Sequence, residues 1–185
     1  MKMREKLLII NASPRKNGVC AEVEKQIRSY FIEMDIEAYN TYELNPAPCI
    51  ACGYCEQNKG CCQHDLDDFF IKFEEADYIA IFSPVYNNFF PSTFKALLDR
   101  FQWYYSLRFS HNVTPPVNKS KRVGMVLCSG SKCVPVADYM INSLKQSLTI
   151  LNSSLTAKYY IPSTDIGKYS FNIIELEKFI HMLKG

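Results

Sequence analysis

The chain has 185 residues, of which 48% are hydrophobic and 22% charged, and this composition suits one globular domain with a sizeable core. The formal net charge of +2 is too small, and the basic runs are too short, for a protein that binds nucleic acid or an anionic membrane through charge. No apolar segment approaches the length of a membrane span, and the apolar run at residues 7–10 is too short for a secretory signal. The eight cysteines therefore predict a reducing, cytoplasmic setting and metal or redox use rather than structural disulfides.

The first third of the chain has the pattern of a strand, a helix and a second strand. Residues 6–11 form a short apolar run that is typical of a buried strand. After a polar loop at residues 12–18, residues 20–34 carry apolar side chains at helical spacing. Residues 36–44 are rich in tyrosine and threonine, which favours a strand. The connection that follows, at about residues 45–64, is long for a compact domain, and long loops are commonly functional.

The rest of the chain continues this alternation. Asp65 is expected to cap a helix that ends near Ala76, and residues 77–83 form a strand that is apolar on both faces. The remaining predicted elements are a helix at residues 91–108, a strand at 122–128, a helix at 136–151, a strand at 155–161 and a helix at 173–183. Five strands alternating with five helices predict one α/β domain over residues 1–185, with a parallel sheet covered on both faces.

The long loop carries four cysteines in the pattern C-x2-C-x2-C-x5-C, at Cys49, Cys52, Cys55 and Cys61. Thiolates this close together can converge on one small group, and an iron–sulfur cubane is favoured. Zinc is the main rival, although its ligands more often come as two pairs separated by a longer stretch. Free thiols and a disulfide stay open as alternatives. Cys62 adjoins Cys61 and could replace it, but it is expected to point elsewhere and to be dispensable.

Three further loops leave the carboxyl ends of predicted strands, where open parallel sheets bind their ligands. Residues 13–18 read S-P-R-K-N-G and lead into a helix, so their backbone N–H groups, with Arg15 and Lys16, favour a phosphate over a simple helix-capping turn. Neither the Walker A pattern nor G-x-G-x-x-G is present. Residues 83–91 read S-P-V-Y-N-N-F-F-P and suit a flat heterocycle, unless the loop packs into the core or a subunit contact. The third loop is at residues 129–132.

In combination, these motifs carry a resemblance to a known family. The order S-P-R-x-x-G, cysteine cluster, S-P-V-Y and K-x3-D-R resembles the flavodoxin-like NAD(P)H-dependent FMN reductase family. The cysteine loop resembles that of its iron–sulfur flavoprotein branch. The likeness covers most of the chain, from residue 7 to about 132. It implies a flavodoxin-like three-layer sandwich whose five-stranded parallel sheet has the order 2-1-3-4-5, with FMN at the point where that order reverses.

The resemblance also assigns residues to each group. The first loop would bind the FMN phosphate, the second would flank the isoalloxazine ring, and the third would lie nearby. The implied cofactor residues are Ser13, Arg15, Asn17, Gly18, Val19, Cys20, Pro84, Val85, Tyr86, Asn87, Asn88, Phe89, Ser129 and Gly130. The implied cluster ligands are Cys49, Cys52, Cys55 and Cys61. The chain departs from the family pattern at Val19 and Cys20, where the family has a small polar residue and then Ser or Thr, but the backbone amides there remain available.

The leading interpretation is an FMN-dependent oxidoreductase that accepts hydride from NADH or NADPH. With a [4Fe–4S] cluster, it would pass electrons on to a small-molecule or protein acceptor. No nucleophile–base set is recognisable, so no catalytic side chain is assigned. The alternatives are a flavin or quinone reductase without a cluster, a flavodoxin-like electron carrier without NAD(P)H activity, and a non-redox phosphate-binding module.

Two expectations concern side chains outside these loops. The aromatic run at residues 103–109 is expected in the core or at a subunit interface, and it predicts a homodimer or tetramer. His111 and His181 show no partner pattern and are expected at the surface. His64 follows the cysteines and could be a fifth candidate ligand or a proton donor, but an exposed position in the loop is favoured.

Overall fold

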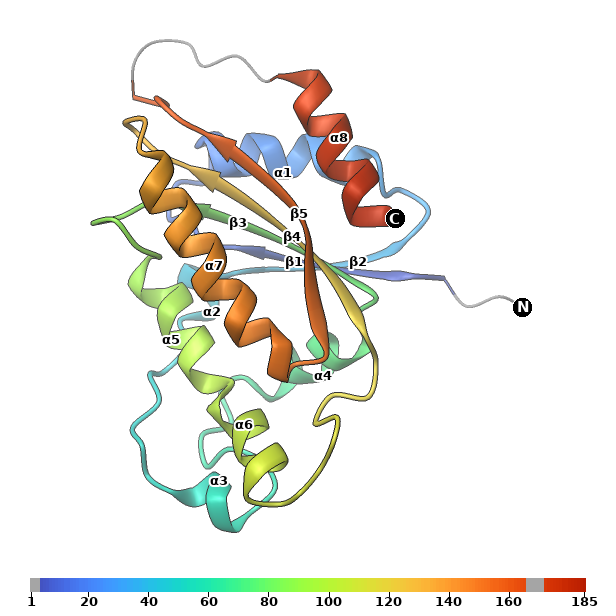
Figure 1. The fold of residues 1–185 in the computed structure, drawn as a ribbon, viewed down its shortest axis with the longest axis vertical. Helices are drawn as coiled ribbons and strands as arrows, with labels where there is room; N and C mark the ends of the chain where they lie inside the picture. Colours follow the sequence, from blue (N-terminus) through green and yellow to red (C-terminus); the bar gives the residue numbers. More distant parts are fainter. Residues whose placement is uncertain (1–3, 166–171) are drawn as a thin grey trace.

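The computed structural model of the chain describes residues 4–165 and 172–185, and it is built around a five-stranded parallel sheet. The strands are β1 (Lys6–Asn11), β2 (Asp35–Asn40), β3 (Tyr78–Pro84), β4 (Lys121–Cys128) and β5 (Ser153–Ile161). Their order is β2-β1-β3-β4-β5, so the direction of winding reverses between β1 and β3 (Figure 1). This flavodoxin-like order confirms the fold predicted from the sequence.

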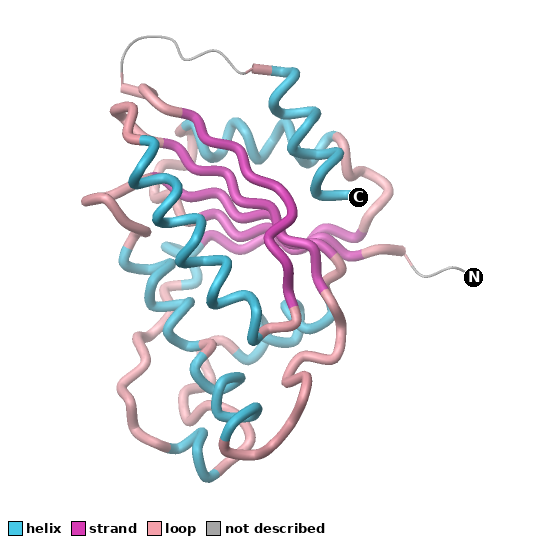
Figure 2. The backbone as a smooth tube through the Cα atoms, viewed as in Figure 1, coloured by secondary structure: helices cyan, strands magenta, loops and turns pink. Residues whose placement is uncertain are grey.

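Helices cover both faces of the sheet (Figures 1 and 2). They are α1 (Val19–Ser29), α2 (Thr41–Leu44), α3 (Tyr54–Gln57), α4 (Asp67–Glu75), α5 (Ser92–Arg100), α6 (Gln102–Phe109), α7 (Val134–Ile150) and α8 (Ile173–Lys184). Helices α1 and α8 pack on one face, and α4, α5 and α7 pack on the other. The short helix α3 and helix α6 lie together at one end of the molecule, at the bottom of Figure 1.

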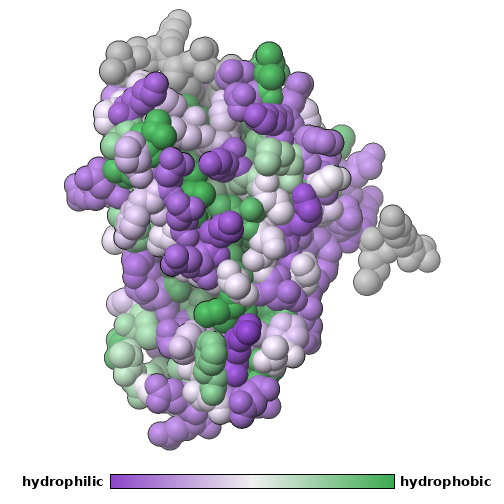
Figure 3. Space-filling view, viewed as in Figure 1, coloured by the Kyte–Doolittle hydropathy of each residue, from purple (hydrophilic) through white to green (hydrophobic). Residues whose placement is uncertain are grey.

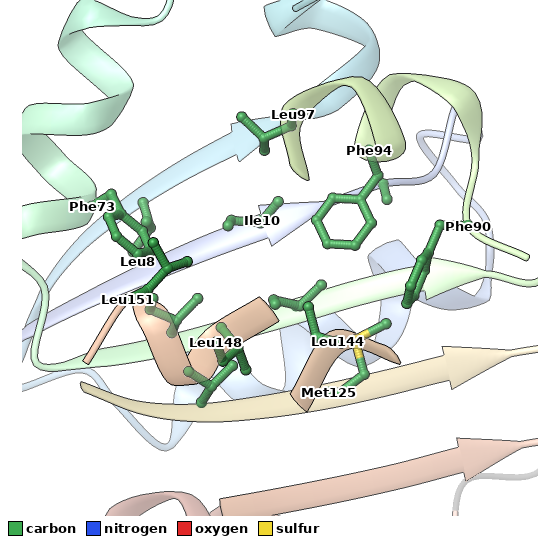
Figure 4. Close-up of a cluster of buried hydrophobic side chains, with 14 of the residues drawn as sticks. Leu8, Ile10, Phe73, Phe90, Phe94, Leu97, Met125, Leu144, Leu148 and Leu151 are labelled. Atoms are coloured by element: carbon green, nitrogen blue, oxygen red, sulfur yellow. The ribbon is translucent and has the colours of Figure 1, made fainter. Parts of the chain in front are cut away.

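The apolar run of β1 is buried because its side chains alternate between the two layers. Leu7 and Ile9 belong to the core under α1 and α8, whereas Leu8 and Ile10 belong to the core under α4, α5 and α7. Figure 4 shows Leu8 and Ile10 in this second core, with Phe94 of α5 close to Ile10. On the face drawn in Figure 3, hydrophilic side chains predominate and hydrophobic ones show between them. Within the described residues, no helix combines the length and apolar character that crossing a membrane requires.

Two predicted ends are wrong because local hydrogen bonds stop an element early. The second strand ends at Asn40, and the predicted continuation to residue 44 is helix α2. The Asn40 side chain accepts a hydrogen bond of 2.9 Å from the N–H of Tyr42 and so caps that helix. Helix α1 ends at Ser29, and turn hydrogen bonds such as Phe31 N–H to Arg28 O replace its predicted last residues.

Two further predictions fail around α4 and α5. Leu66 occupies the N-cap position of α4, because the Asp65 carboxylate is engaged by the guanidinium of Arg100 and the N–H of Ala47. The helix predicted at residues 91–108 is two helices, α5 and α6, which meet at Phe101. Both differences lie beside the cysteine loop, where side-chain contacts override the local sequence pattern.

Candidate functional site

Three predicted ligand loops meet at the carboxyl edge of the sheet. The parallel register of β1, β3 and β4 brings their carboxyl ends to the same edge, at the left of Figure 1. Backbone hydrogen bonds tie the loops together there, from Ala12 N–H to Phe82 O at 2.7 Å and from Val85 N–H to Cys128 O at 2.8 Å. The edge lies at the reversal of strand order, where doubly wound sheets bind their ligands.

The first loop is a tight turn that leaves its helix without a side-chain cap. Ser13 is buried, and its hydroxyl accepts a hydrogen bond of 3.2 Å from the N–H of Arg15. Gly18 is the N-cap of α1 and offers no capping side chain. A Cβ at Gly18 would lie 2.9 Å from the Cβ of Arg15, so the close turn favours glycine there. The first N–H groups of α1, including those of Val19 and Cys20, lack intrahelical acceptors and suit an anion.

The charged side chains of this loop are exposed. Arg15 and Asn17 are open to solvent, and Lys16 pairs with Glu43 at 2.8 Å. A cavity of about 440 Å³ beside the loop is lined by Arg15, Lys16 and Glu43, together with residues of α1 and β2. None of its lining residues comes from the second or third loop.

The second loop forms a two-residue hairpin. Tyr86 and Phe89 exchange backbone hydrogen bonds of 2.9 Å in both directions. Asn87 and Asn88, with φ of 48° and 61°, adopt the left-handed conformation that such turns require and that asparagine tolerates. Tyr86, Asn87 and Asn88 are exposed, whereas Pro84, Val85 and Phe89 are half-buried. The hairpin therefore presents polar groups and an aromatic ring at the sheet edge.

The third loop is closed by its own hydrogen bonds. The buried Ser129 hydroxyl lies 2.6 Å from Ser131 O and 2.8 Å from the hydroxyl of Tyr160. A Cβ at Gly130 would lie 2.0 Å from a carboxylate oxygen of Asp165, so the Asp165 side chain packs directly against the Gly130 backbone. Cys20 and Cys128 are buried below these loops, which makes the Cys20 thiol a packing group.

The cysteine loop lies apart from this edge, at the bottom of Figure 1. It encloses a cavity of about 300 Å³ against the junction of α5 and α6. All four predicted ligands line it, and so does Cys62, against the expectation that Cys62 points elsewhere. Its cysteine and junction residues are Cys49, Cys52, Cys55, Cys61, Cys62, Arg100 and Trp103. All eight cysteines of the chain are free thiols in the structure.

The thiols of the cavity are not chemically equivalent. The sulfurs of Cys52 and Cys62 lie 3.3 Å apart. A hydrogen bond from the N–H of Tyr54, together with the Cys62 thiol, lowers the pKa of Cys52. The hydrogen bond with Cys52 and partial burial raise the pKa of Cys62 to about 11. Cys52 is therefore the more readily deprotonated of this pair, and the thiolate is the form that binds metal.

The profile of the family described as NADPH-dependent FMN reductase matches residues 5–157, which is most of the chain. The chain belongs to this NADPH-dependent FMN reductase family. The match spans all three strand-end loops and the cysteine loop.

Three curated relatives all carry the name iron–sulfur flavoprotein. One from Methanosarcina thermophila is 34% identical over 98 residues, 51% of each protein. One from Methanocaldococcus jannaschii is 27% identical over 168 residues, 88% of this chain and 83% of the relative. One from Clostridioides difficile is 30% identical over 100 residues, 51% of this chain and 44% of the relative. The matches thus span about half of the first and third relatives and most of the second.

Solved structures share the fold at low identity. An NAD(P)H:quinone oxidoreductase from Methanothermobacter marburgensis superposes with a TM-score of 0.74 at 16% identity, covering 97% of this chain and 94% of that one. An FMN-dependent NADH-azoreductase from Bacillus anthracis, determined in complex with FMN, has a TM-score of 0.61 at 18% identity, covering 97% and 96%. At these identities the likeness establishes the flavodoxin-like fold alone.

The first loop of this chain offers groups that suit a phosphate. The uncapped start of α1 supplies N–H donors, the glycine turn keeps the backbone open, and Arg15 supplies charge. The residues present therefore fit the phosphate of FMN. Beside them, the hairpin of the second loop offers the backbone and aromatic groups that a flavin ring requires.

The cysteine cavity carries enough thiols for either a cluster or a single zinc ion. Among residues 4–165 and 172–185, no three Cys, His, Asp or Glu side chains are arranged to hold one metal ion. Four thiolates on one tetrahedral zinc would stand roughly 3.8 Å from one another, given Zn–S bonds of about 2.3 Å. A cubane offers one iron at each corner, so its four thiolates stand farther apart. The sulfurs of Cys52 and Cys62, 3.3 Å apart, are closer than either arrangement requires.

Sequence reasoning missed three residues that contact the cysteine loop. Arg100 has an exposed fraction of 1% and donates hydrogen bonds to both ends of the cysteine loop. His111, expected as a surface residue, is half-buried, and its Nε2 lies 3.0 Å from the carbonyl oxygen of Cys55. The hydroxyl of Ser106 lies 3.3 Å from the sulfur of Cys55. A signal for Arg100 existed, because it lies at helical spacing from the buried residues Phe94 and Leu97.

The contacts of Arg100 keep its guanidinium charged at the wall of the cavity. Burial by itself lowers the pKa of Arg100, but its ion pair with Asp65 and the neighbouring Cys61 thiol raise that pKa above its ordinary value. The guanidinium is therefore charged beside Cys61. His64 is exposed as expected and pairs with Asp67 at 2.9 Å rather than with a cysteine.

Proposed function

We propose that this protein is an FMN-dependent NAD(P)H oxidoreductase that passes electrons through a [4Fe–4S] cluster held in its cysteine loop. The observation that carries the proposal is the cavity of about 300 Å³ lined by all four predicted cysteine ligands, in a chain of the FMN reductase family. The names of the curated relatives support the same combination of flavin and cluster.

The chain would contribute binding, orientation and shielding. The side chains of Ser13, Arg15 and Asn17, with the backbone N–H groups of Gly18 to Cys20, would hold the phosphate. Pro84 to Asn87 would flank the flavin ring, with Asn88 and Phe89 nearby and the third loop, Ser129 and Gly130, at its edge. FMN, when bound, supplies hydride exchange with the nicotinamide and one-electron transfer.

The proposed cluster ligands are Cys49, Cys52, Cys55 and Cys61. Each would supply one iron corner, so loss of any one should open the cluster to oxygen. The test is the iron content and visible absorbance of five single Cys→Ser proteins prepared without oxygen, one for each of these residues and one for Cys62. Loss of iron at the four but not at Cys62 supports the assignment. Loss at Cys62 with retention at Cys61 moves the fourth ligand by one position, because both line the cavity.

The redox activity is tested on the anaerobically purified protein. Its absorbance spectrum and its iron and acid-labile sulfide content distinguish flavin from cluster. Anaerobic mixing with NADH, and separately with NADPH, should bleach the flavin and identify the preferred donor. Protein that holds flavin but neither iron nor sulfide is a reductase without a cluster. Protein that stays oxidised with both nucleotides is an electron carrier, and protein that refuses FMN is neither.

The proposal extends to the cellular location and the oligomeric state of the protein. We propose one flavodoxin-like domain over residues 1–185, working in the cytoplasm, where its eight free cysteines would stay reduced. The electron acceptor would be a small molecule or a protein. A homodimer or tetramer would use the exposed aromatic residues of α6, Tyr105 and Phe109.

A further inference from the structure

We infer that Arg100 and Trp103 act as N–H donors to the sulfur atoms of the group bound in the cysteine cavity, and that Arg100 also closes the loop that holds this group. The inference rests on the proposed function, since it requires a cluster in that cavity. It assigns a positioning role to two side chains outside the cysteine motif.

The guanidinium of Arg100 clamps the two ends of the cysteine loop. It donates to Ala47 O at 3.0 Å, before the first cysteine, and to Gln63 O at 2.8 Å, after the last. It also pairs with Asp65 at 2.7 Å. The Asp65 carboxylate in turn accepts from the N–H of Ala47 at 2.9 Å, which joins the two ends a second time. A charged side chain that is fully buried in this way fixes the loop from inside.

Two donors at this wall of the cavity are left without an acceptor. Among the described residues, the buried side-chain nitrogens that lack a hydrogen-bond partner are Nε of Arg100 and Nε1 of Trp103. Both side chains line the cysteine cavity. Buried N–H groups without a partner are uncommon and destabilising, and two of them at one cavity indicate that an acceptor belongs there. Thiolate and sulfide sulfur atoms are acceptors of the required charge.

This arrangement would favour the reduced form of a cluster. Reduction adds one negative charge, and N–H donors and a guanidinium stabilise the more negative state. The same contacts should leave the potential of the flavin unchanged, because the flavin is assigned to the loops at the carboxyl edge of the sheet, apart from the cysteine cavity. The two side chains therefore bear on the potential of the cluster and on its retention.

The experiment compares wild-type protein with two conservative variants, all prepared without oxygen. Arg100→Lys keeps the positive charge but removes the Nε donor, and Trp103→Phe keeps an aromatic ring but removes the only polar hydrogen. The matched control is Arg108→Gln on α6, whose guanidinium lies over the Phe109 ring, 5.6 Å from its centroid, and does not line the cavity. The readouts are iron and sulfide per subunit and the midpoint potential of the cluster, followed by electron paramagnetic resonance.

We expect Trp103→Phe to retain its iron and to shift the equilibrium toward the oxidised cluster about tenfold, which is about 59 mV for a one-electron couple. Arg100→Lys should show a shift of the same sign or lose iron, and Arg108→Gln should match wild type. A loaded Trp103→Phe protein with the wild-type potential would overturn the donor role, even if Arg100→Lys loses iron. Wild-type protein without iron and sulfide would instead refute the proposed cluster, and the inference with it.

Discussion

The clamp on the cysteine loop predicts that Asp65→Ala destabilises the fold far more than an exposed carboxylate would. Asp65 accepts two hydrogen bonds, from the Arg100 guanidinium at 2.7 Å and from the N–H of Ala47 at 2.9 Å. Its removal leaves Arg100 buried without its carboxylate partner and takes away one of the two hydrogen bonds that hold Ala47. Asp67, two residues along, provides a control, because it is exposed and its partner is the exposed His64.

The magnitude follows from the two contacts. Hydrogen bonds to charged groups contribute about 1.5–3 kcal/mol each, and the sum is reduced because the Asp65 side chain is 33% exposed. We expect a loss of about 2–4 kcal/mol in the free energy of unfolding, equivalent to roughly 4–16 °C in Tm for a chain of this size. Asp67→Ala should cost about 1 kcal/mol or less.

The effect should depend on pH in a defined direction. Burial alone would raise the pKa of Asp65, but the bonds from Ala47 and Arg100 bring it below its ordinary value of 3.8. A carboxyl whose pKa is lower in the folded state stabilises the fold above its unfolded pKa and loses that contribution as pH falls through the folded value. The difference between wild type and Asp65→Ala should therefore be constant from about pH 5 to 8 and shrink below about pH 4.

Denaturant unfolding of both proteins across this pH range measures the difference directly. The clamp is refuted if Asp65→Ala costs no more than Asp67→Ala, or if its cost is unchanged below the pKa of the carboxyl. A large cost without pH dependence would assign the effect to packing rather than to the ion pair.

Three further predictions concern other parts of the molecule. Arg15→Ala should weaken FMN binding by about 1.5–3 kcal/mol in a titration of apoprotein, and unchanged affinity would remove Arg15 from the site. Gly124→Ala should lower stability by about 1–3 kcal/mol in denaturant melts, because the new Cβ would lie 2.5 Å from the Phe179 ring of α8; wild-type stability would show that α8 moves without cost. Light scattering at micromolar concentration should give a dimer or larger, which Tyr105→Ser with Phe109→Ser should weaken, whereas a wild-type monomer would exclude the proposed interface.

Most of the fold was predictable because four of the strands have apolar content and the longer helices have helical spacing, whereas β2 was indicated only by its tyrosine and threonine and the short helices α2 and α3 by nothing. β1 is a clear case, since its four central residues are buried on alternating faces and no helix period fits so short a run. The order of strands came from the resemblance rather than from periodicity. Boundaries failed where a side chain found a partner that sequence does not reveal. Asn40 caps α2 instead of extending β2, and Asp65 pairs with Arg100 instead of capping α4.

In the candidate site, too, the residues that are close in sequence could be predicted and the contacts between distant residues could not. The cysteines were recognisable because they lie close together in sequence, but the rest of the cavity wall comes from the distant junction of α5 and α6. Arg100 lies 35 positions from Asp65 and 53 from Ala47, so nothing local connects it to the loop that it clamps. Its burial on an otherwise apolar helix face is the one sign that it has a fixed partner, because an arginine is almost never fully buried without one. The motif K-x3-D-R ends at Arg100, and this residue binds both ends of the cysteine loop. These hydrogen bonds explain why a charged residue occupies a position on α5 where an apolar side chain would otherwise be expected.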